Sequence, residues 1–249
     1  MSAGRGSGQR QAEPDEVRAM FARVAPRYDL LNRLLSAGID RRWRAALVSR
    51  LGQLSGHVLV DACCGTGDLA FALERAGARV IGVDFTPEML VRARAKQRTP
   101  GGLFVGGDAL ALPIASAAAD ASSIAFGIRN VADRLQGLRE LARVVRAGGW
   151  VLVLEFSLPR GRLLGPLYRL YFTRVLPRIG GWISGDPGAY RYLPETVLSW
   201  PSPDELRAEM ESVGLEECGY RLLSGGIACL SWGRVPALAG AAQTKRHDP

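Results

Sequence analysis

The hydrophobic positions of the chain fall into two alternating patterns. Apolar runs of strand length occur at 57–62, 79–84, 103–108, 121–126 and 150–156. Between these runs, apolar positions recur with a helical period, which predicts helices at 68–76, 86–98 and 134–146. Strands that alternate with helices are typical of a parallel sheet with helical crossovers. The pattern therefore predicts an α/β fold.

Two of the predicted helices carry end signals in their sequence. The segment 86–88 reads Thr-Pro-Glu, which predicts a cap, a first-turn proline and an acidic residue at the positive end of the second helix. The segment 147–149 reads Ala-Gly-Gly, which predicts a glycine stop at the end of the third helix.

The last part of the chain departs from this alternation. The segment 202–205 reads Ser-Pro-Asp-Glu, a capping box that predicts a helix ending at Gly214. Strand-like runs at 215–223 and 227–234 then meet at the short glycine link 224–226, which predicts an antiparallel hairpin. A parallel sheet that ends in an antiparallel hairpin is typical of class I methyltransferases and differs from the sheet of nicotinamide dehydrogenases.

Composition divides the chain into one domain with two tails. Residues 1–14 are mostly Gly, Ser, Gln and Arg with little to bury, which predicts a disordered leader. We expect a single methyltransferase domain over 15–234, opened by a helical cap at 15–56, and a flexible tail at 235–249. The segment 157–201 is too long for an ordinary loop, and we expect it to face the substrate and a membrane.

The positive charge of the chain bears on what the segment 157–201 contacts. The net charge of +8 comes almost wholly from arginine, and on charge alone it fits nucleic acid, anionic lipid, acidic ligands or simple solubility equally. Residues 157–185 hold five arginines and no carboxylate, interleaved with leucines and aromatic residues. This composition predicts a basic amphipathic cap that lies on a membrane surface.

The cysteines and the lengths of the apolar runs indicate where in the cell the protein is expected. The four cysteines show no C-x-x-C spacing and are interpreted as reduced thiols, with no metal site. No apolar run approaches the roughly 20 residues of a membrane span. We therefore expect a cytoplasmic protein that makes peripheral contact with the inner face of the membrane; the sequence leaves a homodimer open.

The candidate cofactor site begins at the turn after the first strand, in the stretch "DACCGTGDLAF". Gly65 and Gly67 fit a glycine-rich turn at the start of a helix, as in dinucleotide sites. Asp61 and Asp68 flank this turn, however, and two carboxylates would repel the phosphates of a dinucleotide. S-adenosylmethionine has no phosphate and carries a sulfonium and an ammonium, which nearby carboxylates favour. The turn therefore predicts S-adenosylmethionine as the cofactor.

Acidic residues also follow the next two strands. Asp84 ends the second strand, where its carboxylate can accept hydrogen bonds from both ribose hydroxyls, a feature shared with NAD sites. Asp108 and Ala109 follow the third strand, where the carboxylate can accept from an adenine amino group and the next amide can donate to the ring. For a lone aspartate the simpler interpretation is a turn cap. Beside Asp61, the glycine turn and Asp84, the binding interpretation is favoured.

Several stretches resemble a known family, the ubiquinone/menaquinone biosynthesis C-methyltransferases. They are "MFARVAPRYDLLNRLLSAGIDRRWR", "CCGTGDLAF", "GVDFTPEML", "GDALALP", "AFGIRNVADR", "LRELARVVRAGGWVLVLEFSLP" and "YRYLPETVLSWPSPDEL". The match runs from about residue 17 to 232. The resemblance implies a class I fold and transfer of a methyl group from S-adenosylmethionine to a ring carbon of a polyprenylated quinol. The short leader resembles the members that convert demethylmenaquinol to menaquinol more than the dual-substrate ones, which stay the alternative.

The resemblance also assigns site residues. It places Thr66, Asp84, Asp108 and Ala109 on the cofactor-binding positions of the family. Ala125 departs from the pattern, because some relatives have a serine there that also touches the cofactor.

The catalytic base is not evident, because His57 lies in the first strand and His247 in the tail. Polar candidates elsewhere are Tyr28, Asp29, Arg129, Asn130, Tyr190 and Tyr192. Of these, we expect Arg129, Asn130 and Tyr28 to be catalytic, with Arg129 stabilising a phenolate. The alternative for Arg129 is a surface ion pair with Asp133 or Glu140.

A nucleic-acid methyltransferase would also use the basic charge of the chain. However, the segment 126–130 reads Phe-Gly-Ile-Arg-Asn, which is not the Asn/Asp-Pro-Pro-aromatic motif of amino methylation, and it holds no cysteine nucleophile. We therefore expect polyprenylated demethylmenaquinol and the membrane surface as partners, and no nucleic acid.

Overall fold

The computed structural model describes residues 14–30, 36, 38–97, 102–159, 165, 168, 170, 173, 174, 194 and 196–237. The strands are β1 (Val58–Ala62), β2 (Arg79–Asp84), β3 (Leu103–Gly106), β4 (Ala119–Ala125), β5 (Val145–Phe156), β6 (Glu216–Leu223) and β7 (Ala228–Arg234). The α-helices are α1 (Pro14–Val24), α3 (Asp40–Leu51), α4 (Asp68–Arg75), α5 (Pro87–Lys96), α6 (Arg134–Arg143) and α10 (Pro203–Ser212). Short 3₁₀ turns are η1 (Ala25–Arg27), η2 (Ile128–Asn130) and η4 (Ser224–Gly226). The predicted leader, most of the C-terminal tail and most of 157–201 lie outside the described residues.

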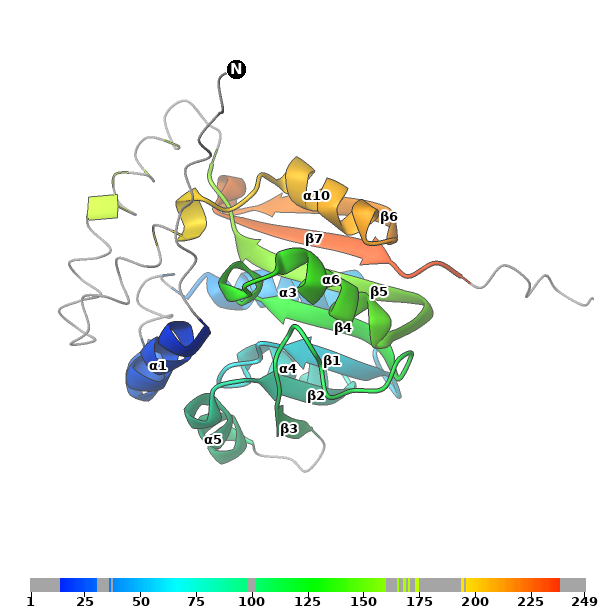
Figure 1. Ribbon diagram of the computed structural model, residues 1–249, viewed down its shortest axis with the longest axis horizontal. Coiled ribbons are helices and arrows are strands. Elements are labelled where there is room, and N and C mark those ends of the chain that lie inside the picture. Colours follow the sequence, from blue (N-terminus) through cyan, green and yellow to red (C-terminus); the bar gives the residue numbers. More distant parts are fainter. Residues whose placement is uncertain are drawn as a thin grey trace, which may run out of the picture.

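The strands form one seven-stranded sheet in the order β3-β2-β1-β4-β5-β7-β6 (Figure 1). The neighbours from β3 to β5 all pair parallel. β7 pairs antiparallel with both β5 and β6, so it is the strand that reverses direction. The predicted α/β fold, a mostly parallel sheet ending in an antiparallel hairpin, is confirmed.

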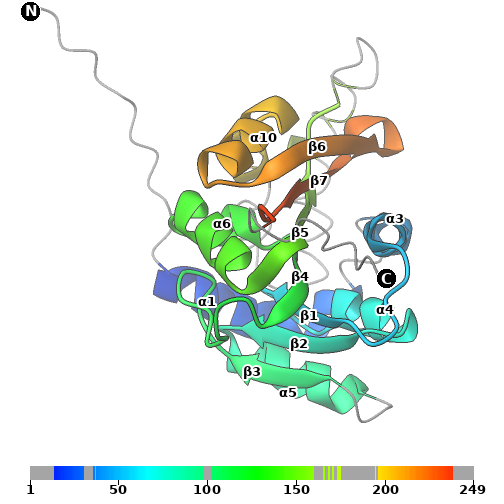
Figure 2. The ribbon, with the colours of Figure 1, turned by 90° about the vertical axis from the view of Figure 1, so that its right-hand side faces the viewer.

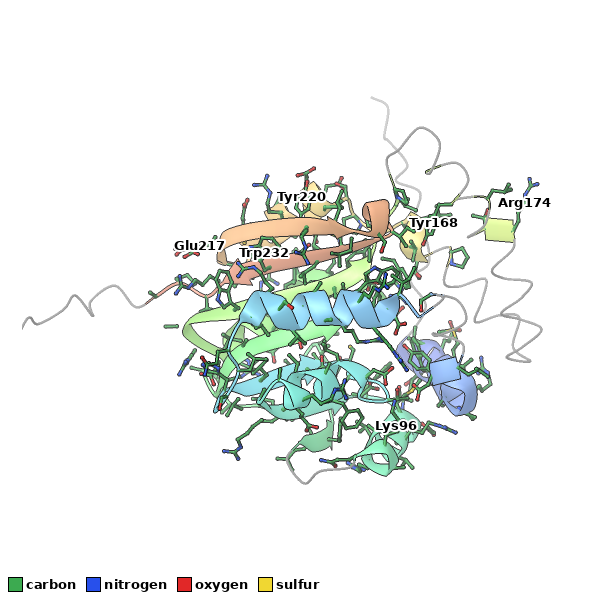
Figure 3. The ribbon with its side chains drawn as sticks, turned by 180° about the vertical axis from the view of Figure 1, so that it is seen from behind. Lys96, Tyr168, Arg174, Glu217, Tyr220 and Trp232 are labelled. Carbon is green, nitrogen blue, oxygen red and sulfur yellow. The ribbon has the colours of Figure 1, made fainter. Side chains whose placement is uncertain are left out.

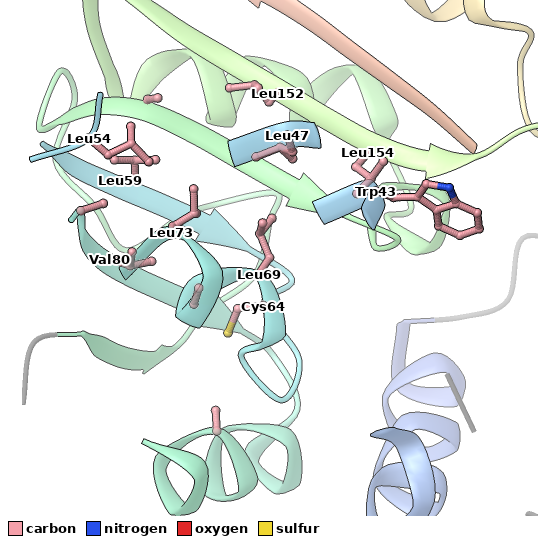
Figure 4. Close-up of a cluster of buried hydrophobic side chains, with 14 of the residues drawn as sticks. Trp43, Leu47, Leu54, Leu59, Cys64, Leu69, Leu73, Val80, Leu152 and Leu154 are labelled. Carbon is pink, nitrogen blue, oxygen red and sulfur yellow. The ribbon is translucent and has the colours of Figure 1, made fainter. Parts of the chain in front are cut away.

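Both faces of the sheet are covered, which explains why its strands are so apolar. Figure 2 shows α6 and α10 on one side of the sheet and α3 and α4 on the other. On β1, Leu59 belongs to the core cluster that includes side chains of α3, α4 and α5, whereas Val60 belongs to the cluster of α6 and α10. Figure 4 shows the first cluster, with Trp43 and Leu47 of α3 against Leu154 of β5. Through these contacts α3 is packed onto the sheet beside α4.

The prediction for the end of the third helix was wrong. α6 ends at Arg143, and β5 begins at Val145 and runs through the glycines that were expected to stop the helix. Gly149 instead allows β5 to lie close to the backbone of β4, since a Cβ on Gly149 would lie 2.4 Å from the carbonyl oxygen of Asp120. The N–H of Gly148 donates to the carbonyl of Val235, which extends the β5–β7 ladder.

The two predicted helix starts differ in their chemistry. The capping box of α10 is confirmed: Glu205 N–H donates to Ser202 Oγ, and Ser202 N–H donates to Glu205 Oε2. Thr86 does occupy the N-cap position of α5, but its hydroxyl makes no capping hydrogen bond. Its own N–H instead donates to Oδ1 of Asp84 at 2.8 Å. The start of α5 is therefore tied to the end of β2.

Candidate active site

Two adjoining pockets lie at the carboxyl ends of β1, β2 and β4, the edge where ligands bind in open parallel sheets. The larger pocket is open to solvent, and about 740 Å³ of empty space lies between its walls and its mouth. The pockets share wall residues from β1, β4 and the N-terminal region: Tyr28, Cys63, Gly65, Ala125 and Phe126. A ligand can therefore extend from one pocket into the other.

The glycine turn between β1 and α4 requires both of its glycines. Gly65 and Gly67 have φ angles of +55° and +85°, in the left-handed region that side chains disfavour. A Cβ on Gly67 would also lie 2.9 Å from the ring of Phe71. The turn thus brings the backbone of Gly65 to the wall of both pockets.

Asp84 lines the larger pocket and holds the glycine turn. Its Oδ2 accepts the N–H of Gly65 at 2.8 Å, and its Oδ1 accepts the N–H of Thr86. The side chain is buried, and burial raises the pKa of its carboxyl. Each oxygen retains a lone pair, so the carboxylate can still accept from hydroxyls of a ligand.

The third strand contributes Asp108 and Ala109 to the same pocket, as the sequence predicts. The simpler interpretation of Asp108 also holds, because its Oδ1 accepts the N–H of Leu110 at 2.9 Å. Asp108 is exposed, so its carboxylate is accessible to a ligand, whereas Ala109 next to it is buried. The turn-cap and binding interpretations are therefore compatible.

Asp61, on β1, lines the smaller pocket and is 1% exposed. Ser123 Oγ donates to its Oδ1 at 3.0 Å, whereas Oδ2 is buried with no hydrogen-bond partner in the described part of the chain. Burial raises the pKa of this carboxyl to about 7, although the Ser123 hydrogen bond and the charge of Arg44 oppose the rise. A positive ligand near Asp61 would stabilise its charged form.

Thr66 and Asp68 are held by a charge network that sequence reasoning missed. Thr66 Oγ1 donates to Asp29 Oδ1 at 2.6 Å, and Lys96 donates to Asp29, Asp68 and Thr66 at 2.9, 2.7 and 3.1 Å. Lys96 lies at the end of α5 (Figure 3). The rarity of lysine was the signal that could have pointed to Lys96, since the chain has two lysines and the other one is in the tail. The network fastens the N-terminal cap to the glycine turn and neutralises Asp68.

Tyr28 and Asn130 both line the larger pocket, as expected of catalytic candidates. The ring of Tyr28 packs edge-on against Phe21, with 6.2 Å between centroids, and lies beside Gly65. Oδ1 of Asn130 is buried without a hydrogen-bond partner among the described residues. An unpaired buried acceptor on a pocket wall is suited to a ligand donor. The candidates Tyr190 and Tyr192 lie outside the described residues.

Arg129 is not among the described residues that line either pocket. Its Nη1 donates to Glu155 Oε1 at 2.5 Å and to the carbonyl of Phe126 at 2.8 Å, and both charged side chains are nearly buried. The predicted surface pairs do not form: Asp133 caps α6 and Glu140 pairs with Arg143. Sequence reasoning missed Glu155, although a carboxylate within the apolar run of β5 was a visible signal. A catalytic role for Arg129 stays a prediction.

Backbone strain marks the junction of the two pockets. Cys63 follows β1 and Phe126 follows β4, and both have positive φ angles, of 50° and 57°. A Cβ on the neighbouring Gly127 would lie 2.4 Å from Cβ of Cys63, so only glycine allows this approach. Strained residues of this kind are typical of functional sites, where the surrounding structure holds them in place.

The donor set fits S-adenosylmethionine better than a phosphorylated cofactor. Asp84 and Asp108 give the larger pocket a negative charge, and its remaining wall is largely apolar and aromatic. Asp61 adds a buried acid to the smaller pocket. Such a site favours a cationic nucleoside and would repel a pyrophosphate.

The strand order, the reversed β7 and the glycine turn define a class I methyltransferase fold. Among solved structures, the chain is similar to the putative methyltransferase in complex with the Trm112 methyltransferase activator of Haloferax volcanii, with a TM-score of 0.66, 18% identity and coverage of 87% of this chain and 97% of that one. It is also similar to phosphoethanolamine N-methyltransferase 2 of Haemonchus contortus, solved with S-adenosylmethionine, with a TM-score of 0.58, 13% identity and coverage of 78% and 52%. At these identities the likeness concerns the fold alone.

The chain belongs to the ubiE/COQ5 methyltransferase family, whose model matches residues 9–235. It is 50% identical over 221 residues to the demethylmenaquinone methyltransferase of Thermus thermophilus, covering 87% of this chain and all of the relative. It is 43% identical to the ubiquinone/menaquinone biosynthesis C-methyltransferase UbiE of a Geobacter species, covering 86% of this chain and 94% of the relative. The family predicted from the sequence is confirmed.

Proposed function

We propose that the protein transfers a methyl group from S-adenosylmethionine to a ring carbon of polyprenylated demethylmenaquinol, which yields menaquinol. One observation carries this proposal: the larger pocket combines an acidic wall, at Asp84 and Asp108, with an apolar aromatic wall that includes Phe21, Tyr28 and Phe126. The first wall suits a cationic nucleoside and the second suits a flat hydrocarbon ring. The names of the relatives support the same reaction.

Bound S-adenosylmethionine would supply a methyl group on a positively charged sulfur. Asp84 would accept hydrogen bonds from its ribose, and Asp108 with the N–H of Ala109 would bind its adenine. The glycine turn and Asp61 would face its amino-acid end. Thr66 would line the same end of the site, and its hydroxyl is held by a hydrogen bond to Asp29.

The apolar wall would align the quinol ring and exclude water. Alignment of two reactants is itself a large source of acceleration, with effective molarities of up to ~10⁵–10⁸ M in favourable cases. The ring carbon becomes electron-rich when a ring hydroxyl loses its proton, so the substrate should be the reduced quinol. Among the described residues lining the pockets there is no histidine. We propose that Asn130 and Tyr28 bind the ring hydroxyl, and that its proton leaves through water. After the transfer, the methylated ring carbon would lose its own hydrogen as a proton and the ring oxygen would regain one, which restores the aromatic quinol.

For Arg129, the contact with Glu155 supports a positioning role more than direct stabilisation of a phenolate. Its guanidinium holds the carbonyl of Phe126, and Phe126 lines both pockets. It also precedes Asn130 in η2. Arg129 would therefore shape the wall that the substrate ring contacts.

Contact with a membrane is a further part of the proposal, because a polyprenylated quinol resides in the bilayer. None of the helices in the described part of the chain is long and apolar enough to cross a membrane. The basic amphipathic cap, residues 157–185, would instead lie on the surface. Its described members support this, since Leu170 is exposed, as is Arg174, which is labelled in Figure 3.

The proposal is tested by mass spectrometry of the quinones of cells that lack this protein. Accumulated demethylmenaquinone, restored to menaquinone by the gene supplied in trans, would support it, and an unchanged quinone profile would refute it. The purified protein should methylate the reduced naphthoquinol and leave the oxidised quinone unmodified. Including a polyprenylated benzoquinol that lacks the ring methyl group in the same assay distinguishes a menaquinone enzyme from a dual-substrate one.

A further inference from the structure

The loop between β3 and β4, residues 107–118, contains the segment that the proposed function assigns to the adenine of the cofactor. Asp108, Ala109 and Leu110 of this loop line the larger pocket. The rest of the loop lies at the surface, and Leu112 is the only buried residue among residues 110–118. A loop with so little buried apolar surface needs polar contacts to keep its pocket-lining residues in place.

Three side chains on one face of α6 supply these contacts. They are Gln136, Glu140 and Arg143, which follow one another at about one helical turn and are here called the α6 clamp. Gln136 Nε2 donates to the carbonyl of Leu110 at 3.2 Å, and Glu140 Oε2 accepts the N–H of Leu112 at 2.8 Å. The α6 clamp thus pairs backbone groups of the loop that have no strand or helix partner.

Arg143 makes the largest number of these contacts. Its Nη1 donates to the carbonyl of Ile114 at 2.8 Å, and its Nη2 donates to the carbonyl of Leu112 at 3.0 Å. The same guanidinium donates to both carboxylate oxygens of Glu140, each at 2.7 Å, which lowers the pKa of that carboxyl. The side chain of Arg143 is 34% exposed, so the ion pair itself adds little stability. Its contacts with the loop carbonyls instead fix the path of the backbone.

The α6 clamp reaches Asp108 through Leu110. The N–H of Leu110 donates to Oδ1 of Asp108 at 2.9 Å, and the carbonyl of the same residue accepts from Gln136. The next residue along, Ala111, donates its N–H to the carbonyl of Asp108 at 3.1 Å. The position of the Asp108 carboxylate therefore depends on how α6 holds the residues that follow it.

The same helix also contacts the opposite wall of the larger pocket. Asn130 and Val131 line that pocket and lie just before α6 in the chain. A Cβ on Gly137 of α6 would lie 3.3 Å from Cγ1 of Val131, so Val131 packs closely against the helix. One helix therefore joins the wall assigned to the cofactor to the wall assigned to the quinol ring. Their separation determines how well the two reactants are aligned.

We infer that the α6 clamp positions Asp108 for the adenine of S-adenosylmethionine and thereby sets the cofactor against the acceptor wall. The inference rests on the proposed function and adds three positioning residues to it. None of the three lines either pocket, so each acts through the loop. The rival explanation is that the α6 clamp only stabilises the fold.

A double-mutant cycle separates the two explanations, because a positioning residue acts through Asp108 and a structural one does not. Isothermal calorimetry would measure binding of S-adenosylhomocysteine to the wild type, Asp108→Ala, Arg143→Met and Asp108→Ala/Arg143→Met. Thermal denaturation would follow the stability of the same proteins. The matched control is Arg139→Met, which removes the same charge from an exposed position of the same helix.

Arg143→Met should weaken binding by about 10-fold when Asp108 is present, and much less when Asp108 is replaced by alanine. Arg143→Lys should recover part of the loss, because an ammonium can still donate to a loop carbonyl. Arg139→Met should bind as the wild type does.

A lower melting temperature with unchanged affinity, or an equal loss of affinity in both backgrounds, would overturn the inference. If Arg143→Met does not fold, Gln136→Met carries the same comparison, since Gln136 holds the carbonyl of Leu110 alone among the described contacts of its side chain. A wild-type protein that does not bind S-adenosylhomocysteine would overturn the proposed function itself.

Discussion

Asp84 Oδ2 accepts the backbone N–H of Gly65 at 2.8 Å, which joins the end of β2 to the glycine turn after β1. The same carboxylate accepts the N–H of Thr86 at the start of α5. One buried side chain therefore fixes two backbone segments of the pocket, and it also lines that pocket. Its proposed binding role and its structural role cannot be removed separately.

Asp84→Ala should accordingly lose both cofactor affinity and stability. Two amides lose their acceptor, and leaving such groups unpaired costs about 1–3 kcal/mol each. Asp108→Ala should weaken cofactor binding with little change in melting temperature, because Asp108 is exposed and, among the described residues, its carboxylate accepts only the N–H of Leu110. Calorimetry with S-adenosylhomocysteine and thermal denaturation would measure both. Wild-type affinity in either variant would contradict its place in the site.

The positions of these acids could be predicted from the sequence, because the carboxyl end of a strand has a fixed position in a parallel sheet. Asp84 ends β2 at the residue where the apolar run stops, and Asp108 follows β3 closely. Lys96 and Glu155 could not be assigned in this way. Their roles depend on how the end of α5 meets the glycine turn and how η2 meets β5, which are tertiary contacts without a local sequence pattern. The predicted end of the third helix was wrong for a related reason, since Gly148 belongs to β5 and its N–H donates to the carbonyl of Val235, beyond the end of β7.

The buried pair of Arg129 and Glu155 allows catalysis and architecture to be separated. Glu155→Leu alone should destabilise the fold by about 3–5 kcal/mol, because it leaves the guanidinium unpaired in a buried site. Arg129→Met/Glu155→Leu should recover most of that loss, since hydrophobic replacement of a whole buried pair is often neutral. Urea denaturation would measure the two stabilities.

Turnover of the double variant then tests the role of Arg129. If Arg129 positions Phe126 and Asn130, the stable double variant should keep its affinity for S-adenosylmethionine and lose turnover with a raised KM for the quinol. A double variant as stable as the wild type and equally active would remove Arg129 from the reaction altogether.

Asp61 should make the ligand-free protein less stable as the pH rises. Its pKa in the folded chain is about 7, above the ordinary value of 3.8, so the folded state holds a proton that the unfolded state has released between these values. The stability that this proton contributes is fully present below about pH 4 and is lost as the pH rises through 7. Asp61→Asn should remove the contribution of this proton. The melting temperature of the variant should therefore fall less than that of the wild type between pH 5 and pH 8.

Ligand binding should show the opposite dependence on pH. A cationic ligand favours the ionised form of Asp61, so affinity for S-adenosylmethionine should rise from pH 5.5 to pH 8 in the wild type and change less in Asp61→Asn. Calorimetry in buffers of different ionisation enthalpy would report the proton released on binding. Equal pH profiles for the two proteins would show that Asp61 does not titrate in this range.

The basic amphipathic cap, residues 157–185, gives the last prediction. Each arginine near an anionic surface can add ~1 kcal/mol, and neighbouring leucines and aromatic residues can enter the acyl boundary. Co-sedimentation of the protein with liposomes should therefore rise with the fraction of anionic lipid and fall with salt. Glutamate at Arg162, Arg169 and Arg174 should weaken it and leave S-adenosylmethionine binding unchanged. The same charge change at the exposed Arg41, Arg42 and Arg79 is the matched control, because it alters net charge without touching the cap. Equal liposome binding by both triple variants would mean that net charge alone draws the protein to lipid, and it would refute the membrane role of the cap.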